Sequence, residues 1–440
     1  MPRKAVASNP QRPAKTGSAA PIITGFAPLA LALVVPHVTL PSATAPPSQQ
    51  LLAPAPLLSK GQPVDWWFVF KFNAASGPEC GGAQRVCPFG GMVQPYPKFG
   101  QQFAYASSAS PILQKAGGCL GDTTTDPVGA TFEQVYDGHP FYVLWNDQFD
   151  GDPIHTQEAP TGHSKGMLAW NADGNGVVLQ VSTPSWPGSG SANHPRQMDG
   201  NTLGCVKDND VLVSQHFFSL RLTKDDVVNV AKGLVNASVA TDTTNPQIVN
   251  NGGPSEIQAV VQGLGKHSTS KSPMNVMLST GVRFLSKPSK LEVPPWQMVS
   301  ALLGGEPLRV ASWYTRPEIP STTAGTAMGC WDASLGKPGD VEIATSGTWD
   351  GMSIGLLGMP EPDGNHAKVS VSTGSHPWAI FGDLNQQGSL VEGKCGSSQN
   401  GRGGTFYVVE NADLAKSVTE LLKGDPGSGR PESAPEPPRK

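Results

Sequence analysis

Two copies of a His-x-Lys pattern lie far apart in the chain. The first is His163 and Lys165 in GHSKG, and the second is His366 and Lys368 in GNHAK. Because side chains alternate between the two faces of an extended strand, each copy would present an imidazole beside an ammonium. One such pair can bind a phosphate. Two facing pairs can cleave a phosphodiester, because together they supply a nucleophile, a general acid and cations for the phosphate oxygens.

Each pair falls in a stretch with the pattern of a strand next to a turn. Apolar residues 167–169 follow the first pair, and Val369 and Val371 follow the second. Gly, Asn and Asp cluster nearby, as they do in turns. We therefore expect strands over 163–170 and 366–372. Loops beside rigid strands are frequent places for catalytic residues.

The rest of the chain predicts an α/β sandwich, because strand patterns alternate with helix patterns. Loops are expected over 74–131 and 183–210. Helices are expected within 223–264, near 296–303 and over 413–423, the last capped by Asp413 and stopped by Gly424. Further strands are expected at 65–72, 140–146, 176–182, 282–286, 378–384 and 405–410.

The two ends of the chain have the composition of segments outside the fold. Four basic residues precede the apolar run FAPLALALVV, which predicts a secretory signal over 1–45 and a secreted or periplasmic protein. Pro28 and Pro36 shorten the run below the ~20 residues that span a bilayer, so no membrane anchoring is expected after signal removal. Residues 46–60 are interpreted as a linker and 425–440 as a disordered tail.

Cysteine content agrees with export. The six cysteines form an even set, which favours disulfides in an exported chain, and their spacing does not choose among the possible pairings. Neither C-x-x-C nor H-E-x-x-H occurs, so we expect no metal centre and no cofactor.

The charge balance points to a partner that binds in acid. The net charge is −4, and without the first 50 residues 27 basic and 35 acidic side chains remain, a net charge of −8. A polyanion is a poor partner for such a surface at neutral pH. Near pH 5 the eight remaining histidines would roughly cancel the negative excess.

Several fragments, taken in order, resemble the deoxyribonuclease II family, the acid endonucleases related in fold to phospholipase D. The resemblance covers residues 61–424. The fragments are GQPVDWW (61–67), LWNDQ (144–148), GHSKG (162–166), NADG (171–174), STPSWP (182–187), TLGC (202–205), NHAK (365–368), PWAIFGDLNQQ (377–387) and GRGGT (401–405). The implied fold is a duplicated mixed-sheet sandwich with pseudo-symmetric halves at 61–222 and 223–424, each carrying one His-x-Lys. Departures are Val181 and Gln386, where animal members usually carry His and Arg.

The resemblance implies a metal-independent endodeoxyribonuclease. His163 would attack phosphorus to give a phosphohistidine, and His366 would protonate the leaving 5′-oxygen and then activate water. Lys165 and Lys368 would hold the non-bridging oxygens, and Asn385 matches a polar clamp of the family. The products would carry 3′-phosphate and 5′-hydroxyl ends.

Other residues have two interpretations each. Asp147 and Asn146 either orient the substrate or cap a turn. Trp186, in a loop, is a candidate base contact, whereas Trp66 and Trp67 are assigned to the core. Five histidines outside the pairs are interpreted as surface or packed core residues: His139, His194, His216, His267 and His376.

Two functional alternatives remain open. A phospholipase D-type phosphodiesterase acting on lipid head groups would share the His-x-Lys chemistry but would need an apolar acyl groove. A non-catalytic exported DNA-binding protein would tolerate loss of either histidine. DNA is the expected partner, and a homodimer is possible.

Overall fold

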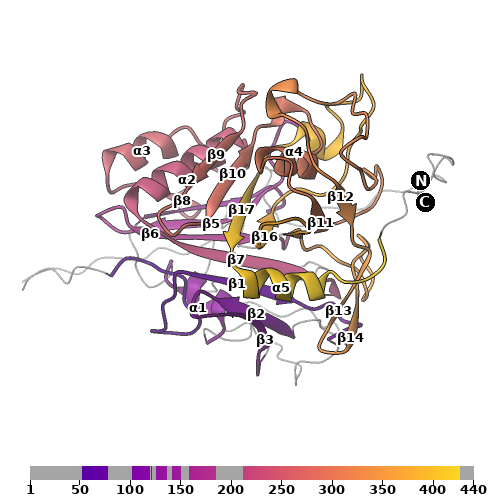
Figure 1. Ribbon diagram of the computed structural model, residues 1–440. Helices are drawn as coiled ribbons and strands as arrows, with labels where there is room; N and C mark the ends of the chain where they lie inside the picture. The colour runs from indigo at the N-terminus through magenta and orange to yellow at the C-terminus, as the bar shows by residue number, and fades with distance from the viewer. Residues whose placement is uncertain are drawn as a thin grey trace, which may run out of the picture. The chain divides into compact units, whose positions relative to one another are not determined.

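Two large β-sheets form the framework of the described part of the chain (Figure 1). The computed structural model describes residues 52–77, 102–118, 120, 125–135, 141–149, 158–184 and 212–426. Helices are few beside the strands, so the fold is mixed α/β. None of the helices in these ranges has both the length and the apolar character needed to cross a bilayer.

The first sheet has eight strands in the order β3-β2-β1-β7-β6-β5-β4-β8, and all neighbours are antiparallel. Aromatic and β-branched residues dominate its central strands because such side chains pack well on a pleated surface. The bounds are β1 Trp66–Lys71, β2 Phe103–Ser107, β3 Ser110–Lys115, β4 Phe141–Asn146, β5 Lys165–Trp170, β6 Gly176–Val181, β7 Gln215–Leu222 and β8 Val249–Asn250.

The second sheet has seven strands in the order β12-β11-β15-β16-β17-β10-β9. Its neighbours are antiparallel except β11 and β12, which are parallel. The strands are β9 Met274–Met277, β10 Arg283–Lys287, β11 Leu308–Ala311, β12 Val341–Ile343, β15 Val369–Ser372, β16 Trp378–Gly382 and β17 Gly404–Glu410. A separate hairpin joins β13 (Ser346–Trp349) to β14 (Met352–Gly355).

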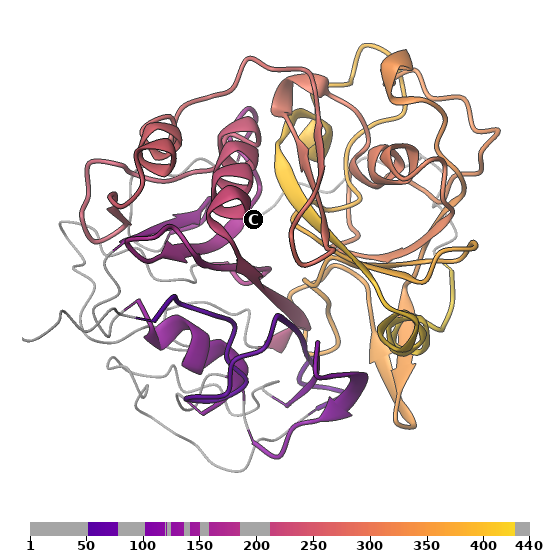
Figure 2. The same ribbon diagram turned by 60° about the vertical axis from the view of Figure 1, so that its left-hand side comes forward.

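Aromatic rings hold the two sheets together. Phe68 of β1 and Phe218 of β7 stack on Phe381 of β16 with ring centroids 4.3 and 4.8 Å apart. Tyr407 of β17 lies 5.3 Å from Phe218. These rings are buried, and stacked aromatic pairs are favourable beyond the area that they bury. The sheets therefore share one apolar core, and Figure 2 shows them side by side.

Helices extend this core and cover the other faces. α2 (Lys224–Asn236) packs against β5, β6, β7 and β10, and α3 (Ser255–Val261) packs on α2. α5 (Ala412–Leu421) contacts β3, β15 and β16. On the opposite face of the second sheet, α4 (Pro295–Leu302) brings Trp296 against Phe406. On the first sheet, Thr131 of α1 (Pro127–Glu133) accepts a hydrogen bond from Trp67 Nε1 at 3.1 Å.

Most expected elements are present, and the differences have local causes. The expected strands at 163–170 and 366–372 begin late, so each His-x-Lys pair lies at the entry to its strand. Asn411, not Asp413, caps α5, because its side chain accepts from Leu414 N at 3.0 Å. The stretch 74–131 was expected to be loops and contains β2, β3 and α1, and β7 has no counterpart among the expected strands.

The boundaries of the folded part also differ from the expected ones. Ala55 and Leu57, expected in the linker, bind the α1 region: Ala55 N donates to Gln134 Oε1 and Leu57 N donates to Thr131 Oγ1, each at 3.0 Å. β8 follows residue 223 and yet pairs with β4, so the first sheet extends past the expected 222/223 boundary. Asp425, expected to be the first residue of the disordered tail, binds the folded part, because its backbone O accepts from Thr345 N at 3.0 Å. The expected signal (1–45) and positions 427–440 of the expected tail lie outside the described residues.

We predict that Gly233→Ala destabilises the protein although Gly233 lies inside α2. Alanine is favoured over glycine in a helix by about 1 kcal/mol. Here an added Cβ would overlap the Phe284 ring of β10, and overpacking of this kind costs about 1–3 kcal/mol. Urea denaturation at pH 7 should give a lower free energy of unfolding for the variant. Lys232→Ala, at an exposed position of the same helix, is the control and should change it by less than about 0.5 kcal/mol. A Gly233→Ala protein at least as stable as the wild type would contradict the packing of α2 on β10.

Candidate active site

The first His-x-Lys pair is held by the second sheet. His163 N donates to Gly403 O at 2.8 Å, and His163 Nδ1 donates to Asp383 O at 2.8 Å. Gly403 immediately precedes β17 and Asp383 immediately follows β16. The histidine at the entry to β5 is therefore positioned by two carbonyl groups at strand ends of the other sheet.

The second pair is held by the first sheet in the same manner. His366 N donates to Ser214 O at 2.8 Å, and His366 Nδ1 donates to Ser182 O at 2.7 Å. Ser214 immediately precedes β7 and Ser182 immediately follows β6. Because a carbonyl oxygen can only accept, both histidines carry their proton on Nδ1 when neutral, and Nε2 carries the lone pair.

The structure brings the four predicted residues of the two pairs into one buried site. Burial, followed by the charges of Lys165, Arg402 and Lys368, lowers the pKa of His163 well below 6.5. Burial, followed by Lys368, Lys165 and His163, lowers the pKa of His366 in the same way. The charges of both lysines thus act on both rings. At neutral pH the two histidines are uncharged.

Asp147 offsets part of this positive charge. Its carboxylate is fully buried and accepts from Lys165 Nζ at 2.6 Å and from Arg402 NH2 at 2.7 Å. Burial raises the pKa of Asp147, but the charges and hydrogen bonds of the two partners outweigh it, and the pKa lies below 3.8. Arg402 also donates to Thr161 O at 2.9 Å and Gly162 O at 3.0 Å. Asp147 was expected to contact substrate or cap a turn; both of its oxygens instead bind basic side chains of the site.

Asp383 joins strands of both sheets beneath the first pair. Its carboxylate accepts from Gln180 Nε2 of β6 at 3.0 Å and from Thr405 N and Oγ1 of β17, each at 2.7 Å. Burial raises the pKa of Asp383 to about 6 against the opposing effect of the Thr405 hydrogen bonds. This carboxyl group therefore titrates in mildly acidic solution while its backbone carbonyl holds His163.

The second lysine, Lys368, makes hydrogen bonds through both its side chain and its backbone N. Lys368 Nζ donates to His366 O at 2.6 Å, and Lys368 N donates to His216 Nδ1 at 3.0 Å. Lys165 thus pairs with a carboxylate, and Lys368 binds a carbonyl group through Nζ and an imidazole through its backbone N.

The remaining predicted residues are placed as follows. Asn385 Nδ2 donates to Gln387 Oε1 at 2.9 Å, and its buried Oδ1 has no hydrogen-bond partner among the described residues. Asn146 Oδ1 accepts from Gln148 N at 2.8 Å, which is the turn-capping alternative. Trp66 and Trp67 are buried in the core, as expected. Trp186 lies outside the described residues.

Sequence reasoning missed three residues of the site. Arg402 and Asp383 occur in GRGGT and GDLN, which carried the family resemblance, but nothing in their spacing links them to the first pair. His216 was interpreted as a surface or core histidine. It lies in β7, which was not expected as a strand, so its contact with Lys368 could not be foreseen.

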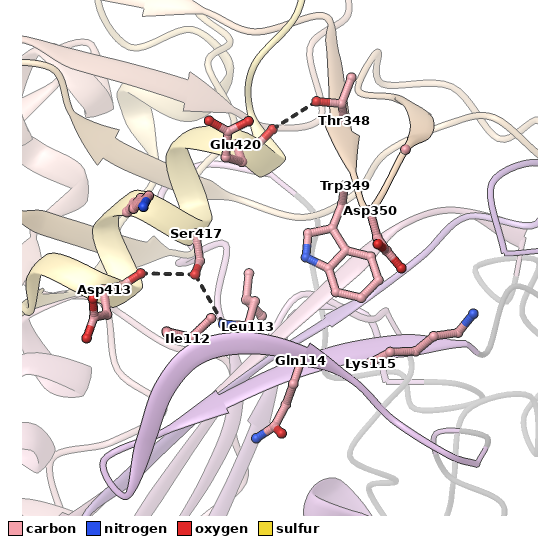
Figure 3. A pocket seen from close by; sticks show the side chains of 12 residues that line it. Ile112, Leu113, Gln114, Lys115, Thr348, Trp349, Asp350, Asp413, Ser417 and Glu420 are labelled. Carbon is pink, nitrogen blue, oxygen red and sulfur yellow. Dashed lines mark hydrogen bonds between the residues drawn. The ribbon is translucent and has the colours of Figure 1, made fainter.

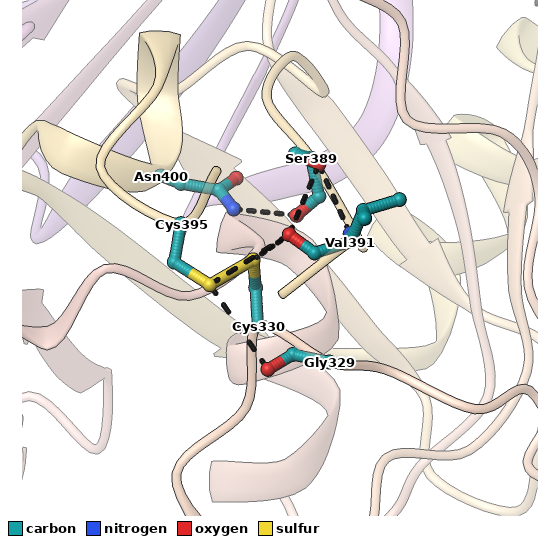
Figure 4. Close-up of a disulfide and its surroundings, with 6 residues drawn as sticks. All are labelled: Gly329, Cys330, Ser389, Val391, Cys395 and Asn400. Atoms are coloured by element: carbon teal, nitrogen blue, oxygen red, sulfur yellow. Dashed lines mark hydrogen bonds between the residues drawn. A yellow bond between two sulfur atoms is a disulfide. The ribbon is translucent and has the colours of Figure 1, made fainter. Parts of the chain in front are cut away.

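A disulfide lies close to the segment that carries Arg402. Cys330 is bonded to Cys395, and Asn400 Nδ2 donates to Ser389 O at 2.7 Å beside it (Figure 4). The bond confirms one of the expected disulfides. Its 65-residue separation contains the second His-x-Lys pair, and such a cross-link stabilises by about 4 kcal/mol in the chain-entropy model. Cys80, Cys87, Cys119 and Cys205 lie outside the described residues.

Lys287 of β10 holds the same segment from inside the fold. Its Nζ donates to Asn400 O at 2.7 Å and Arg402 O at 2.9 Å. Burial lowers the pKa of Lys287 to about 7, although the charge of Glu292 acts in the opposite direction.

A surface pocket of about 610 Å³ is lined by β3, the β13–β14 hairpin and α5 (Figure 3). Trp349 of the hairpin forms part of its wall, and Ser417 of α5 accepts from Leu113 N at 3.1 Å. None of the predicted site residues lines this pocket. Within the described ranges, no three His, Cys, Asp or Glu side chains are grouped as metal ligands.

Comparisons with known proteins agree on one family. The deoxyribonuclease II family matches residues 56–424. Cell-death-related nuclease 7 of Caenorhabditis elegans is 23% identical over 365 residues, which cover 81% of this chain and 83% of the relative. Deoxyribonuclease-2-alpha of Mus musculus is 25% identical over 404 residues, covering 85% and 94%. These similarities define a hydrolytic nuclease. The chain belongs to the deoxyribonuclease II family.

We predict that Asp147→Ala lowers the free energy of unfolding by about 3–5 kcal/mol at pH 7, because it leaves two buried cations without their carboxylate. The folded pKa of Asp147 lies below its ordinary value, so this contribution is present above pH 3.8 and is lost as the pH falls through the folded value. The wild-type and variant stabilities, measured by urea denaturation at pH 7, 5 and 3, should therefore converge in acid.

Glu256→Ala is the matched control for this measurement. Glu256 pairs with Lys224 at 2.8 Å on the surface, where the side chains are 52% and 41% exposed. Loss of an exposed pair should cost less than about 1 kcal/mol. Equal effects of the two substitutions would show that the Asp147 contacts are no more important than a surface ion pair.

Proposed function

We propose that the protein is an exported acid endodeoxyribonuclease that needs no metal and cleaves DNA through a phosphohistidine. The observation that carries this proposal is the mutual support of the two pairs, in which each histidine donates Nδ1–H to a carbonyl group of the other sheet. Both rings therefore carry the Nε2 lone pair that nucleophilic attack on phosphorus and acceptance of a proton require.

The proposed reaction has two steps. In the first, His163 Nε2 attacks phosphorus, the bond to the 5′-oxygen breaks, and protonated His366 gives its Nε2 proton to that oxygen. In the second, neutral His366 takes a proton from water, the water oxygen attacks phosphorus, and the nitrogen–phosphorus bond breaks. The phosphate stays on the 3′ side, and the other product ends in a 5′-hydroxyl.

The two lysines would hold the non-bridging oxygens in place of a metal ion. An ammonium has three N–H donors, so Lys165 can bind Asp147 and donate to phosphate at once. Preorganised cations in a site with little water interact strongly with the charge that builds up on phosphate. Asn385 Oδ1 has no partner among the described residues, and because it can only accept, it is a candidate contact with an N–H group of a DNA base and not with the phosphate.

The strand orders support the proposed phospholipase D-like duplication. The edge strand β3 is left out, and the second sheet is taken in the reverse order, starting at β9. The strands β2-β1-β7-β6-β5-β4-β8 of the first sheet then correspond one by one to β9-β10-β17-β16-β15-β11-β12 of the second. In this alignment β5, which begins in the first His-x-Lys pair, corresponds to β15, which follows the second. The two histidines would then be equivalent positions of two related halves.

Export is supported by the disulfide, since such bonds persist in oxidising compartments. The apolar run after a basic N-terminus supports it independently.

The first functional prediction is that purified protein degrades plasmid DNA at pH 5 in EDTA. His163→Ala and His366→Ala should each lower kcat by at least about 10³-fold, because each histidine serves a step of one covalent cycle. His376→Ala is the control: this exposed histidine stacks on Trp378 and should retain normal activity.

Circular dichroism should show that the three variants are folded. Cutting that appears only with added magnesium would refute the metal-free mechanism. Near-normal activity of either active-site variant would refute the two-histidine cycle.

The second functional prediction concerns pH. The pKa of His366 lies well below 6.5 in the free protein, so kcat/KM should fall as the pH rises toward neutrality, where the general acid loses its proton. A phosphate bound between the pairs raises this pKa, so the corresponding fall in kcat should occur at higher pH. The profiles of both constants, measured at two salt concentrations, separate this effect from surface charge, which acts on KM and depends on salt. A fall confined to KM that disappears at low salt would rule out His366 as the limiting acid.

A further inference from the structure

A third histidine contacts the second His-x-Lys pair. His216 lies on β7, is fully buried, and stacks on Phe381 of β16 with ring centroids 6.4 Å apart. Its Nδ1 accepts a hydrogen bond from Lys368 N at 3.0 Å. Among the described residues Nε2 has no hydrogen-bond partner. The ring therefore makes one hydrogen bond in the described structure, and that bond is to the backbone of the second pair.

This contact fixes a tautomer opposite to that of the two proposed catalytic histidines. Because Lys368 N can only donate, His216 Nδ1 must carry the lone pair and Nε2 the proton. A doubly protonated ring would turn Nδ1–H toward Lys368 N–H. Two donors would then face each other in a buried place, and the hydrogen bond would be lost.

His216 is also tied to the group that orients His366. Its backbone N donates to Ser182 Oγ at 2.9 Å, and its O accepts from Ser182 N at 3.1 Å. Ser182 O in turn accepts from His366 Nδ1 at 2.7 Å. The main chain of His216 thus supports the acceptor of His366, while its ring holds the adjoining Lys368.

The charge around the ring favours its neutral form. Burial, followed by the charge of Lys368, lowers the pKa of His216 well below 6.5. β6 contributes no titratable side chain. On β1, Phe70 pairs in register with His216, and Lys71 pairs with Gln215. Phe70 therefore lies on the same face of the sheet as His216, and Lys71 lies on the other face. The other titratable residues of the surrounding elements are Asp383, Tyr407, His366 and Lys368.

We propose that His216 is a positioning residue whose neutral ring holds the second His-x-Lys pair through Lys368 N–H, and whose protonation releases that pair and sets the acidic limb of activity. The inference rests on the proposed nuclease function. It assigns the loss of activity that comes first as the pH falls to a residue that does not touch the phosphate. Protonation of the nucleophile His163 would follow at lower pH, and the loss toward neutrality belongs to His366.

Two substitutions separate the role of His216 as a hydrogen-bond acceptor from the effect of its protonation. His216→Asn can place Oδ1 where Nδ1 accepts, and it does not titrate. His216→Leu removes the acceptor that the Lys368 N–H uses. The experiment measures kcat and KM on plasmid DNA in EDTA from pH 3.5 to 7, with circular dichroism at each pH to confirm that the protein is folded.

We expect His216→Leu to lose about 10- to 100-fold in kcat at every pH with little change in KM, as an unmade buried hydrogen bond implies. His216→Asn should keep kcat within about threefold of wild type at the optimum and move the acidic limb to lower pH, where protonation of His163 limits activity. His376→Asn makes the same change at an exposed histidine and should keep the wild-type profile.

An acidic limb of His216→Asn that coincides with that of wild type overturns the inference even if the Leu variant does not fold. Equal kcat values for folded Asn and Leu variants overturn it as well. Both results leave the proposed nuclease function intact. Failure of the wild type to cut DNA in EDTA at pH 5 is the separate result that overturns that function.

Discussion

The burial of several basic groups in one site is the constraint on which the rest of the structure depends. Two lysines, an arginine and two histidines lie within each other's electrostatic field, and a low-dielectric interior makes their repulsion large. The fold limits it in two ways. The buried carboxylate of Asp147 neutralises charge between Lys165 and Arg402, and the histidines remain uncharged at neutral pH.

The same repulsion between basic groups favours the binding of an anion to the site at acidic pH. Without substrate, each ring resists protonation, first because it is buried and then because basic groups lie near it. A phosphate diester would cancel part of that field and ease protonation of the leaving-group acid once the substrate is bound. The buried Asp383, with its pKa of about 6, would lose its charge over the same pH range, so the electrostatics of the site and of its support change together. The charge of the protein surface has a different effect, because it acts on the rate of association with DNA more than on the chemical step.

Local patterns in the sequence were enough to predict many elements but not the contacts between them. β1, β6 and β17 follow from runs of aromatic and β-branched residues, and the helix over 412–421 from its apolar period. β7 was missed because its QHFFSLRL run directly precedes a helix pattern. The four residues of the two pairs could be named from a repeated motif and a family resemblance. The contact of His216 with Lys368 spans 152 positions, and no spacing rule reaches across such a distance.

The exchange of carbonyl acceptors between the sheets has a consequence for synthesis of the chain. His163 emerges from the ribosome long before its acceptor at Asp383 exists, and His366 needs Ser182 from the part already made. A chain that ends before residue 383 therefore lacks the acceptor that fixes the tautomer of His163. Segments 383–403 and 212–216 complete the two supports only when both sheets have come together. The backbone acceptors of both rings are therefore in place only after residue 403 has been synthesised and the two sheets have packed together.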